Sequence, residues 1–344
     1  MVTHLPRGDR CCSVRAVSHP CGAVGRGPKL PPERARDRWL GGQAMIPALA
    51  WIQRTRVRVH ERSTVYLELT KPRITLMVML TVALGFYLAP AQASATGIVH
   101  VLLGTLLSCS GAGALNQFLE RDRDRIMRRT RFRPLPTRRI TPAAAATTGC
   151  LLASSGVLYL LRTTNALTAA LDATILATYL FFYTPLKRRS TLSTLVGAIP
   201  GALPPVMGWT AACNRLDPGA LILFAIVFLW QVPHFLAIGR LYREDYQRAG
   251  FAVLSALDPD GRMSGRQMVL YAAALLPVSC ALVPAGVAGP GYLALATMAG
   301  LGYVAAALTA ARDNTRVAAR RVLLASILYL PALAGALLLE RLFG

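Results

Sequence analysis

Three polar side chains near residue 120 have the types and the spacing of a metal site. Asn116, Glu120 and Asp124 lie four residues apart. Four residues of an α-helix advance by about 400°, so the three side chains share one face and drift by only about 40° per step. Mg²⁺ prefers such hard oxygen ligands, usually taking one or two carboxylates and completing its shell with water and substrate phosphate. The spacing therefore predicts a magnesium site that binds a phosphorylated substrate.

Arginines surround this acidic face. Asp122 lies roughly opposite Glu120 on the predicted helix and is not expected to bind the metal. Nine arginines fall between Arg121 and Arg139, and guanidinium groups can bind phosphate oxygens in bidentate fashion. A solvated, salt-bridged loop would contain the same arginines. The prediction of a magnesium site therefore rests on the acids and not on the arginines. Acids are rare at the end of a membrane helix, and those present tend to be functional.

A second polar cluster lies more than a hundred residues further along the chain. Gln231 and His234 interrupt an apolar block that also contains Pro233. Polar side chains in such a block need partners or a cavity. His234 is a candidate haem-iron ligand, and a hydrogen-bonded core histidine is the open alternative. About three turns later, Asp245 is predicted to bind the metal from the second side, with Glu244 beside it. A metal held between the two acidic clusters would stabilise a diphosphate as a leaving group.

Basic residues also mark the ends of two other apolar blocks. Lys71 and Arg73 precede the first block, and Lys187 and Arg188 follow the fourth. If they lie at the same membrane face as the acids, they form the cationic rim that a diphosphate requires. Basic membrane anchors would have the same positions, and this alternative stays open.

Long apolar blocks must position these motifs. Hydrophobic residues make up 54% of the 344 residues and charged residues only 16%, against about a quarter in soluble proteins. Apolar runs of about 18 residues or more predict membrane-spanning helices, so we predict an all-α, polytopic membrane bundle of about nine transmembrane helices. The predicted blocks are Ile74–Ala93, Gly97–Leu115, Pro142–Leu161, Ala166–Tyr183, Leu192–Ala212, Gly219–Gly239, Met268–Gly286, Gly291–Ala311 and Arg321–Leu339.

The net charge of +22 is distributed unevenly between the loops. Loops after the second, fourth, sixth and eighth blocks are rich in arginine and lysine, whereas the opposite loops hold only Arg162 and Arg215. This alternation follows the positive-inside rule and predicts a cytoplasmic N-terminus. It also argues against nucleic acid as the partner of the positive charge.

Residues 1–64 differ from the rest of the chain. They contain twelve Lys and Arg against four Asp and Glu, and no sustained apolar periodicity. This composition predicts a disordered N-terminal extension ahead of a membrane domain that spans residues 65–344. An import presequence and translation from Met45 are the alternatives.

Six motifs in this order resemble the UbiA-type intramembrane prenyltransferases, and within them the branch that farnesylates haem. The resemblance covers the chain from about Leu67 to its end. The motifs are Leu-Thr-Lys-Pro-Arg-Ile-Thr (69–75), the run from Asn116 to Pro136, Tyr-Thr-Pro-Leu-Lys-Arg (183–188), Val-Gly-Ala-Ile-Pro-Gly-Ala-Leu-Pro-Pro (196–205), Trp-Gln-Val-Pro-His-Phe (230–235) and Tyr-Arg-Glu-Asp-Tyr (242–246).

The resemblance implies an Mg²⁺-dependent transferase with a central cavity open to lipid. Mg²⁺ bound by Asn116, Glu120, Asp124 and Asp245 would hold farnesyl diphosphate, whose ionisation gives an allylic cation. A vinyl group of haem b would attack this cation, and water would complete haem O, the precursor of haem A.

The same resemblance places further residues and partners. Tyr183, Lys187 and Arg188 would belong to the diphosphate site, with Arg129 and Arg133 as further candidates. The enzyme would lie in a bacterial cell membrane, or in the mitochondrial inner membrane of a eukaryote. Haem A synthase or other oxidase-assembly proteins would be its protein partners.

The chain departs from the family pattern at several positions. The second acidic motif usually has two acids four residues apart, but Ala249 follows Asp245 at that spacing. Asp172 stands where the pattern has an apolar residue, and Ser193 stands where it has Asn. Two other functions stay open: prenyl transfer to a different acceptor, such as an aromatic acid or chlorophyllide, and transport of an anion. A transporter would use the basic mouth for selectivity and would not need the acids.

Overall fold

Long helices form the described part of the chain, which comprises residues 63–91 and 94–343 of a computed structural model. No strand occurs among these residues, and the predicted all-α class is confirmed. The predicted N-terminal extension and the alternative start at Met45 lie outside the described residues, except for residues 63 and 64.

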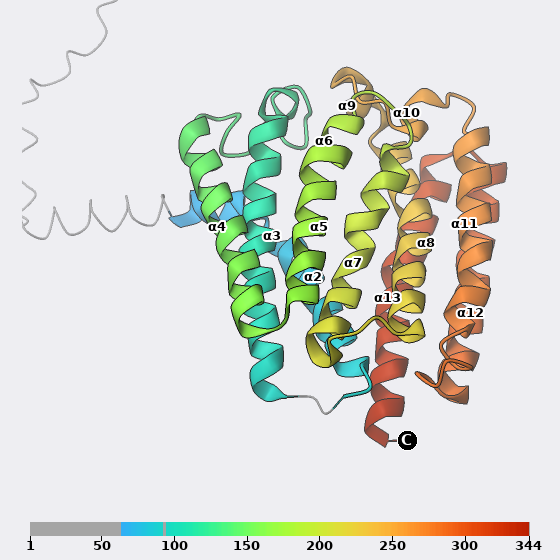
Figure 1. Cartoon of the computed structure of the whole chain (residues 1–344). Helices are drawn as coiled ribbons and strands as arrows, with labels where there is room; N and C mark the ends of the chain where they lie inside the picture. The colour runs from blue at the N-terminus through green and yellow to red at the C-terminus, as the bar shows by residue number, and fades with distance from the viewer. Residues whose placement is uncertain (1–62, 92–93, 344) are drawn as a thin grey trace, which may run out of the picture. The chain divides into compact units, whose positions relative to one another are not determined.

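Each predicted apolar block overlaps a helix of the structure (Figure 1). A short helix, Ser63–Leu69, precedes α2 and is bent by 53° from it. The following elements are α2 (Pro72–Leu88), α3 (Ala95–Asp124), α4 (Pro142–Thr163), α5 (Ala166–Ala177), the π-helical turn η2 (Thr178–Tyr183), α6 (Thr184–Leu186), α7 (Ser193–Cys213), α8 (Pro218–Leu241), α9 (Arg243–Arg248), α10 (Leu254–Leu257), α11 (Arg262–Cys280), α12 (Pro290–Arg312) and α13 (Arg316–Phe343).

Seven of the described helices are long and apolar enough to cross a membrane, or eight if the bent pair that includes α2 is one span. The chain is therefore a multi-pass membrane protein. Helix α11 is not among these spans, so a count of nine spans stays a prediction, as does the central cavity.

Some helix ends differ from the predicted block ends. Helix α2 ends at Leu88 because Pro90 disfavours helical geometry in the residue before it. Helix α11 begins six residues before the predicted block, where Asp258 accepts hydrogen bonds from the backbone N–H and hydroxyl of Ser264. Hydrophobicity alone missed this polar first turn.

The helices pack in two groups. Helices α2, α3, α4, α5 and α7 contact one another, and α8, α11, α12 and α13 form the second group. Helix α7 packs against α8 and joins the two groups. The largest apolar core lies around α7 and the second group, where Trp209, Tyr292, Tyr303 and Tyr329 are fully buried.

Helices α2 and α7 approach each other more closely than side chains would allow. A Cβ atom on Gly85 would lie 1.9 Å from the carbonyl oxygen of Pro205, and one on Gly208 would lie 1.9 Å from that of Val82. Small residues of this kind let membrane helices pack backbone against backbone. This contact fixes α2, whose N-cap residue is Lys71.

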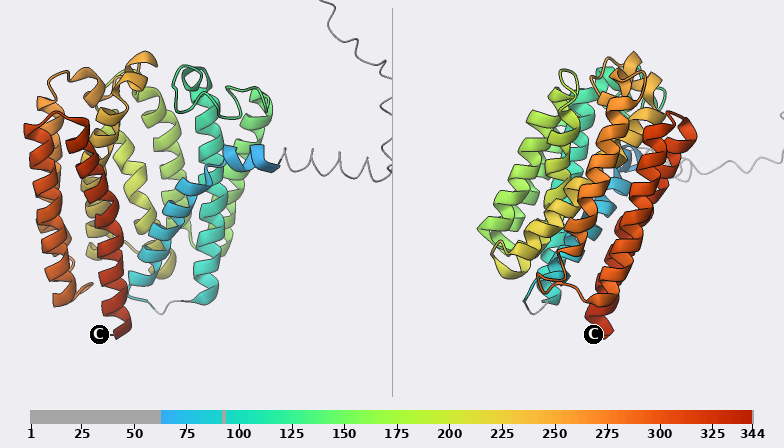
Figure 2. Two further views of the ribbon diagram at one scale, coloured as in Figure 1. Left: turned by 180° about the vertical axis from the view of Figure 1, so that it is seen from behind. Right: turned by 90° about the vertical axis from the view of Figure 1, so that its right-hand side faces the viewer.

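The basic loops lie at one end of the bundle, as the charge alternation predicts. Figures 1 and 2 show the loops after α3, α6, α8 and α12 at this end, with the C-terminus at the other. The predicted metal ligands lie next to these loops, in the last turns of α3 and in α9: Asn116, Glu120, Asp124 and Asp245.

Candidate active site

The predicted acidic face is present on the last turns of α3. This helix is 30 residues long and continues beyond its apolar block to Asp124. Asn116, Glu120 and Asp124 are buried, whereas the side chain of Asp122 is 70% exposed. The helical spacing therefore distinguishes correctly between the three inward side chains and the outward one. Arg121 and Arg123 in the last turn favour helix formation here, because cations stabilise a helix C-terminus.

Each of the three buried side chains contacts a cation from another element. Lys71 Nζ donates to Asn116 Oδ1 at 2.6 Å, and Lys187 Nζ donates to Glu120 Oε1 at 2.9 Å. Arg133 Nη1 lies 2.9 and 2.8 Å from the two carboxylate oxygens of Asp124. Three basic and two acidic side chains thus meet in one cluster, which has a formal surplus of one positive charge.

Backbone irregularities place two of these cations. Lys71 has φ of 52°, a left-handed conformation that non-glycine residues adopt infrequently, immediately before Pro72. The π-helical turn η2 precedes Lys187, and such turns are frequent at functional sites. Tyr183 at the end of η2 lies under Lys187, whose Nζ is 4.4 Å from the ring centroid.

Lys187 remains charged although it is largely buried. Burial lowers the pKa of its ammonium group, but the Glu120 carboxylate and the neighbouring tyrosines raise it by more, so the pKa lies well above its ordinary value. A permanent cation here is suited to a polyanionic ligand.

Thr184 is a site residue that the sequence analysis did not single out. Its hydroxyl accepts a hydrogen bond from Asn116 Nδ2 at 3.2 Å and donates to the carbonyl of Tyr179 at 2.8 Å. These bonds orient the amide so that its oxygen faces Lys71. The position of Thr184 inside the Tyr-Thr-Pro-Leu-Lys-Arg motif is the signal that could have identified it.

The second acidic motif lies against the loop that follows α3. Asp245 is buried, accepts a bond from the backbone N–H of Arg128 at 3.4 Å, and pairs with Arg248. Met127 packs against Ala249 and Phe251 in a small apolar cluster. Packing of the loop after α3 therefore brings the two motifs side by side, but among the described residues Asp245 contacts arginines and forms no bond with the α3 cluster.

The other predicted diphosphate ligands form no bond with the side chains of the α3 cluster in the described structure, except Arg133. Arg188 is exposed and donates to the carbonyl of Leu119 at 3.0 Å. Arg73 is exposed beside Lys71 at the edge of a pocket of about 470 Å³. Arg129 lies over the ring of Tyr242, 4.9 Å from its centroid. Of the two loop arginines predicted as diphosphate ligands, Arg129 and Arg133, only Arg133 bonds to an α3 acid in the described structure.

His234 lies on α8 and bonds to α13. Its Nδ1 is 2.8 Å from Ser326 Oγ, which also donates its single hydrogen to the carbonyl of Leu323 at 2.6 Å. With the Ser326 hydroxyl donating to Leu323, its oxygen accepts from Nδ1–H, which corresponds to the tautomer with an unprotonated Nε2. Trp230 stacks on the His234 ring at 4.9 Å. Among the described residues no hydrogen bond to Nε2 occurs, so this nitrogen is available as a metal ligand.

Asp172 is a buried acid without a complete set of partners. Its Oδ1 accepts from Ser108 Oγ at 2.9 Å, and its Oδ2 has no hydrogen-bond partner among the described residues. We expect Ser108→Ala alone to lower the free energy of unfolding by about 1–3 kcal/mol, because it leaves a second buried oxygen unpaired. The double change Ser108→Ala with Asp172→Leu should be close to neutral. Chemical unfolding in detergent measures both, and a larger loss in the double variant would contradict this account.

Comparison with known proteins identifies the family. A model described as the UbiA prenyltransferase family matches residues 78–329, more than half of the chain. The chain belongs to this family. It is therefore a membrane prenyltransferase, as the six sequence motifs predicted.

Relatives within the family share one name. A protein from Solibacter usitatus called "Protoheme IX farnesyltransferase" is 45% identical over 288 residues, which cover 80% of this chain and 98% of the relative. A protein of the same name from Anaeromyxobacter sp. is 45% identical over 273 residues, covering 79% and 92%. The Arabidopsis thaliana relative, "Protoheme IX farnesyltransferase, mitochondrial", is 34% identical and covers 82% of this chain and 66% of its own length.

Solved structures confirm the fold. A structure of digeranylgeranylglyceryl phosphate synthase has a TM-score of 0.71 at 15% identity and covers 82% of this chain and 99% of its own. A UbiA homologue from Archaeoglobus fulgidus, bound to GPP and Mg²⁺, has a TM-score of 0.58 at 14% identity and covers 79% of this chain and 99% of its own. The chain thus has the helical architecture of this family.

Proposed function

We propose that this chain transfers the farnesyl group of farnesyl diphosphate to a vinyl group of haem b, giving haem O. The observation that carries the proposal is the 45% identity, over nearly the whole length of the relative, to a protein named for this reaction. The buried cluster of oxygens and basic side chains at the end of α3 would bind the metal and the diphosphate.

The donor half of the reaction would take place at the α3 cluster. Lys71, Lys187 and Arg133 would exchange their bonds to side-chain oxygens for bonds to the diphosphate, because the diphosphate carries more negative charge than these side chains. This exchange would free Asn116, Glu120 and Asp124 to bind a metal ion. Because the cluster has a surplus positive charge, an anionic metal–diphosphate complex would bring it close to neutrality.

The donor set of this cluster fits Mg²⁺ that binds together with substrate. Among the described residues, no group of three or more His, Cys, Asp or Glu side chains is arranged to hold an ion by itself. Mg²⁺ commonly uses only one or two carboxylates and completes its shell with phosphate and water. When bound, Mg²⁺ would neutralise the departing diphosphate. Asp245, one turn into the second motif, is proposed as the ligand from the opposite side.

The acceptor half would use the apolar interior and His234. Tyr183 and the apolar side chains below the cluster would exclude water from the allylic cation until the haem vinyl group attacks it. The new cation on the haem would then take up water and release a proton. His234, with Nε2 unprotonated, is the candidate to ligate the haem iron. Arg73 and Arg188 would add positive charge at the rim of the donor site.

The location follows from the same assignment. We propose a bacterial cell membrane, or a mitochondrial inner membrane in a eukaryote, with the basic end and the N-terminus on the cytoplasmic or matrix side. A haem A synthase would consume the product, which makes it the proposed protein partner.

Metal removal tests the proposed reaction. Membranes that contain the protein would be incubated with haem b, farnesyl diphosphate and Mg²⁺. The extracted haems would be separated by chromatography and identified by mass spectrometry. We expect a farnesylated haem that disappears with a chelator and returns with added Mg²⁺.

Two results would contradict the proposal. Product formation that is insensitive to the chelator would remove the metal from the reaction. No new haem from folded, inserted protein would exclude haem as the acceptor, and the same assay with an aromatic acid or chlorophyllide would then test the remaining acceptors.

A further inference from the structure

The chain after α9 turns back onto its own helix in a Schellman motif. The N–H of Gly250 donates to the carbonyl of Gln247 at 3.0 Å. The N–H of Phe251 donates to the carbonyl of Tyr246, also at 3.0 Å. Gly250 has a φ of 66°, a left-handed conformation that glycine adopts freely. The turn brings the ring of Phe251 against that of Tyr246, with the centroids 6.0 Å apart and the planes at 70°.

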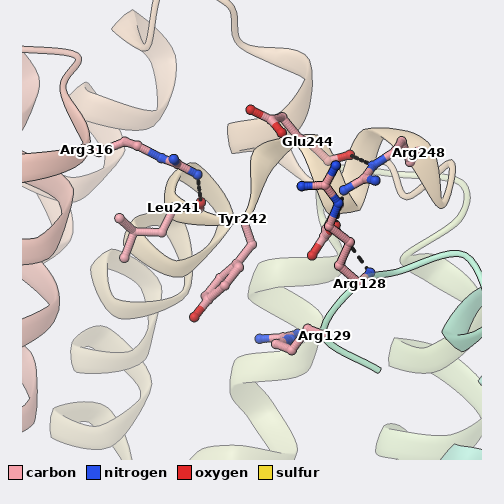
Figure 3. Close-up of a pocket in the computed structure, with 8 residues that line it drawn as sticks. Arg128, Arg129, Leu241, Tyr242, Glu244, Arg248 and Arg316 are labelled. Carbon is pink, nitrogen blue, oxygen red and sulfur yellow. Dashed lines mark hydrogen bonds and ion pairs between the residues drawn. The ribbon is translucent and has the colours of Figure 1, made fainter. Parts of the chain in front are cut away.

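The start of α9 is bonded to the loop that follows α3. Figure 3 shows the pocket of about 340 Å³ at this point, whose lining includes Arg129 and Arg316. Asp245 lines this pocket and accepts a hydrogen bond from the backbone N–H of Arg128, so the pocket is part of the proposed metal–diphosphate site. Helix α9 is therefore fixed at its first turn and at its last.

The turn after α9 also contacts the donor cluster. The N–H of Ala252 donates to the carbonyl of Lys187 at 2.7 Å. Arg123, in the last turn of α3, donates to the carbonyl of Ala249. A segment next to the second acidic motif is thus bonded directly to the lysine that pairs with Glu120.

The ammonium group of Lys187 lies between two aromatic rings. Its Nζ is 4.4 Å from the ring centroid of Tyr183 and 5.9 Å from that of Phe251, which is 5% exposed. Both distances are within the range of a cation–π interaction, which extends to about 6 Å. A ring face attracts an ammonium group without competing with an anion for its N–H donors, whereas a second carboxylate would compete.

This arrangement suits the exchange of partners that the proposed function requires. Lys187 would leave Glu120 for the diphosphate, and ordering its flexible four-carbon stem at that moment costs conformational entropy. Buried rings that already confine the ammonium reduce this cost. Tyr246 directly follows Asp245, so its contact with Phe251 also connects the second proposed metal ligand with the Lys187 side of the site.

We propose that Phe251 is a positioning residue of the donor site, which holds the Lys187 ammonium where it meets the diphosphate and keeps α9 beside it. The inference rests on the proposed function and extends it to a residue outside the six sequence motifs. Phe251 acts through Lys187 and is assigned no contact with the metal or the reacting carbon. The alternative is a packing role alone, in the apolar cluster with Met127 and Ala249, for which another apolar side chain would serve.

Removal of the ring with retention of an apolar side chain separates these two roles. Purified protein in lipid nanodiscs would be titrated calorimetrically with farnesyl diphosphate and Mg²⁺ in the absence of haem, with empty nanodiscs as the blank. We expect Phe251→Leu to weaken binding about fivefold, because the cation–π contact is lost. In the Lys187→Met background the same change should have less than about a twofold effect, because no ammonium is left to position.

Steady-state kinetics add a second readout. In Phe251→Leu the KM for farnesyl diphosphate should rise about fivefold, whereas kcat should change by less than about twofold, because the lost contact serves binding and not the chemical step. Phe251→Tyr keeps the ring and should retain the affinity to within about twofold.

Phe86→Leu is the matched control. Phe86 is 3% exposed and lies near the end of α2 that is remote from Lys71. This change should lower the unfolding temperature about as much as Phe251→Leu does, and it should leave the affinity for farnesyl diphosphate unchanged.

The outcomes separate the two proposals. Unchanged binding in Phe251→Leu, or an equal loss with and without the Lys187 ammonium, overturns the positioning role. If the coupling appears but no farnesylated haem forms, the positioning role stands and the proposed reaction fails. If farnesylated haem forms without the coupling, the reaction stands and the positioning role fails. Both fail if the folded, unchanged protein does not bind farnesyl diphosphate.

Discussion

Asp124→Ala is expected to lower kcat/KM for farnesyl transfer by about a thousandfold, the order of loss found when a preorganised electrostatic contact in an active site is removed. The variant loses both carboxylate oxygens that hold Arg133 and one proposed Mg²⁺ ligand. Arg133 is then free to move, and the metal has fewer protein oxygens. The rate of farnesylated haem formation at several substrate concentrations measures the effect.

The matched control is Asp122→Ala. Asp122 is two residues away on the same helix, is exposed, and only approaches Arg121 and Arg125 at 4.0 Å, so activity should change by less than about twofold. Asp124→Asn keeps the shape of the side chain and tests whether charge is the essential property. Comparable rates of farnesylated haem formation in the Asp122 and Asp124 variants would show that the buried acid has no special role in the reaction.

Gly85→Ala and Gly208→Ala are each expected to destabilise the fold by about 3 kcal/mol or more. The added Cβ would lie 1.9 Å from a carbonyl oxygen of the facing helix, and a backbone atom cannot move aside as a flexible side chain can. Helices α2 and α7 would have to separate. Thermal unfolding in detergent and the yield of monodisperse protein measure the loss.

Gly302→Ala is the matched control for these substitutions. Gly302 also lies within a long helix, α12, and a Cβ at this position would meet no atom of the described residues within 4 Å. Alanine there should leave stability unchanged or slightly raised, since it favours helix more than glycine does. An equal loss of stability in all three variants would falsify the close-packing explanation.

Much of this protein could be predicted from local sequence. Apolar blocks of about twenty residues can only cross a membrane as helices, so the class followed from composition and block length. The spacing of Asn116, Glu120 and Asp124 was sufficient to place them on one face and Asp122 on another, because helical geometry is the same in every sequence. The alternation of charge between loops predicted which helix ends lie at the same end of the bundle, because the positive-inside rule applies to every membrane protein.

The choice among equivalent residues could not be predicted locally. Nine arginines follow the second block, and nothing in their spacing distinguishes Arg133, which bonds Asp124, from Arg129, which stacks on Tyr242. The loop has no regular periodicity, so the direction of each side chain depends on packing with distant residues, such as Met127 against Phe251. The contacts of Lys71 and Lys187 with α3 could not be predicted locally either. They depend on the left-handed backbone of Lys71 and on the π-helical turn before Lys187.

The sequence by itself thus determined the membrane class, the order of the helices and the acidic face of α3, because these depend on residue spacing along single helices. Only the tertiary structure decided which cation meets which oxygen, and that Arg316, more than 180 residues after Arg129, lines the same pocket. Those relations are distances between separate helices, and they arise only when close contacts such as that of Gly85 with Pro205 fix the helices in place.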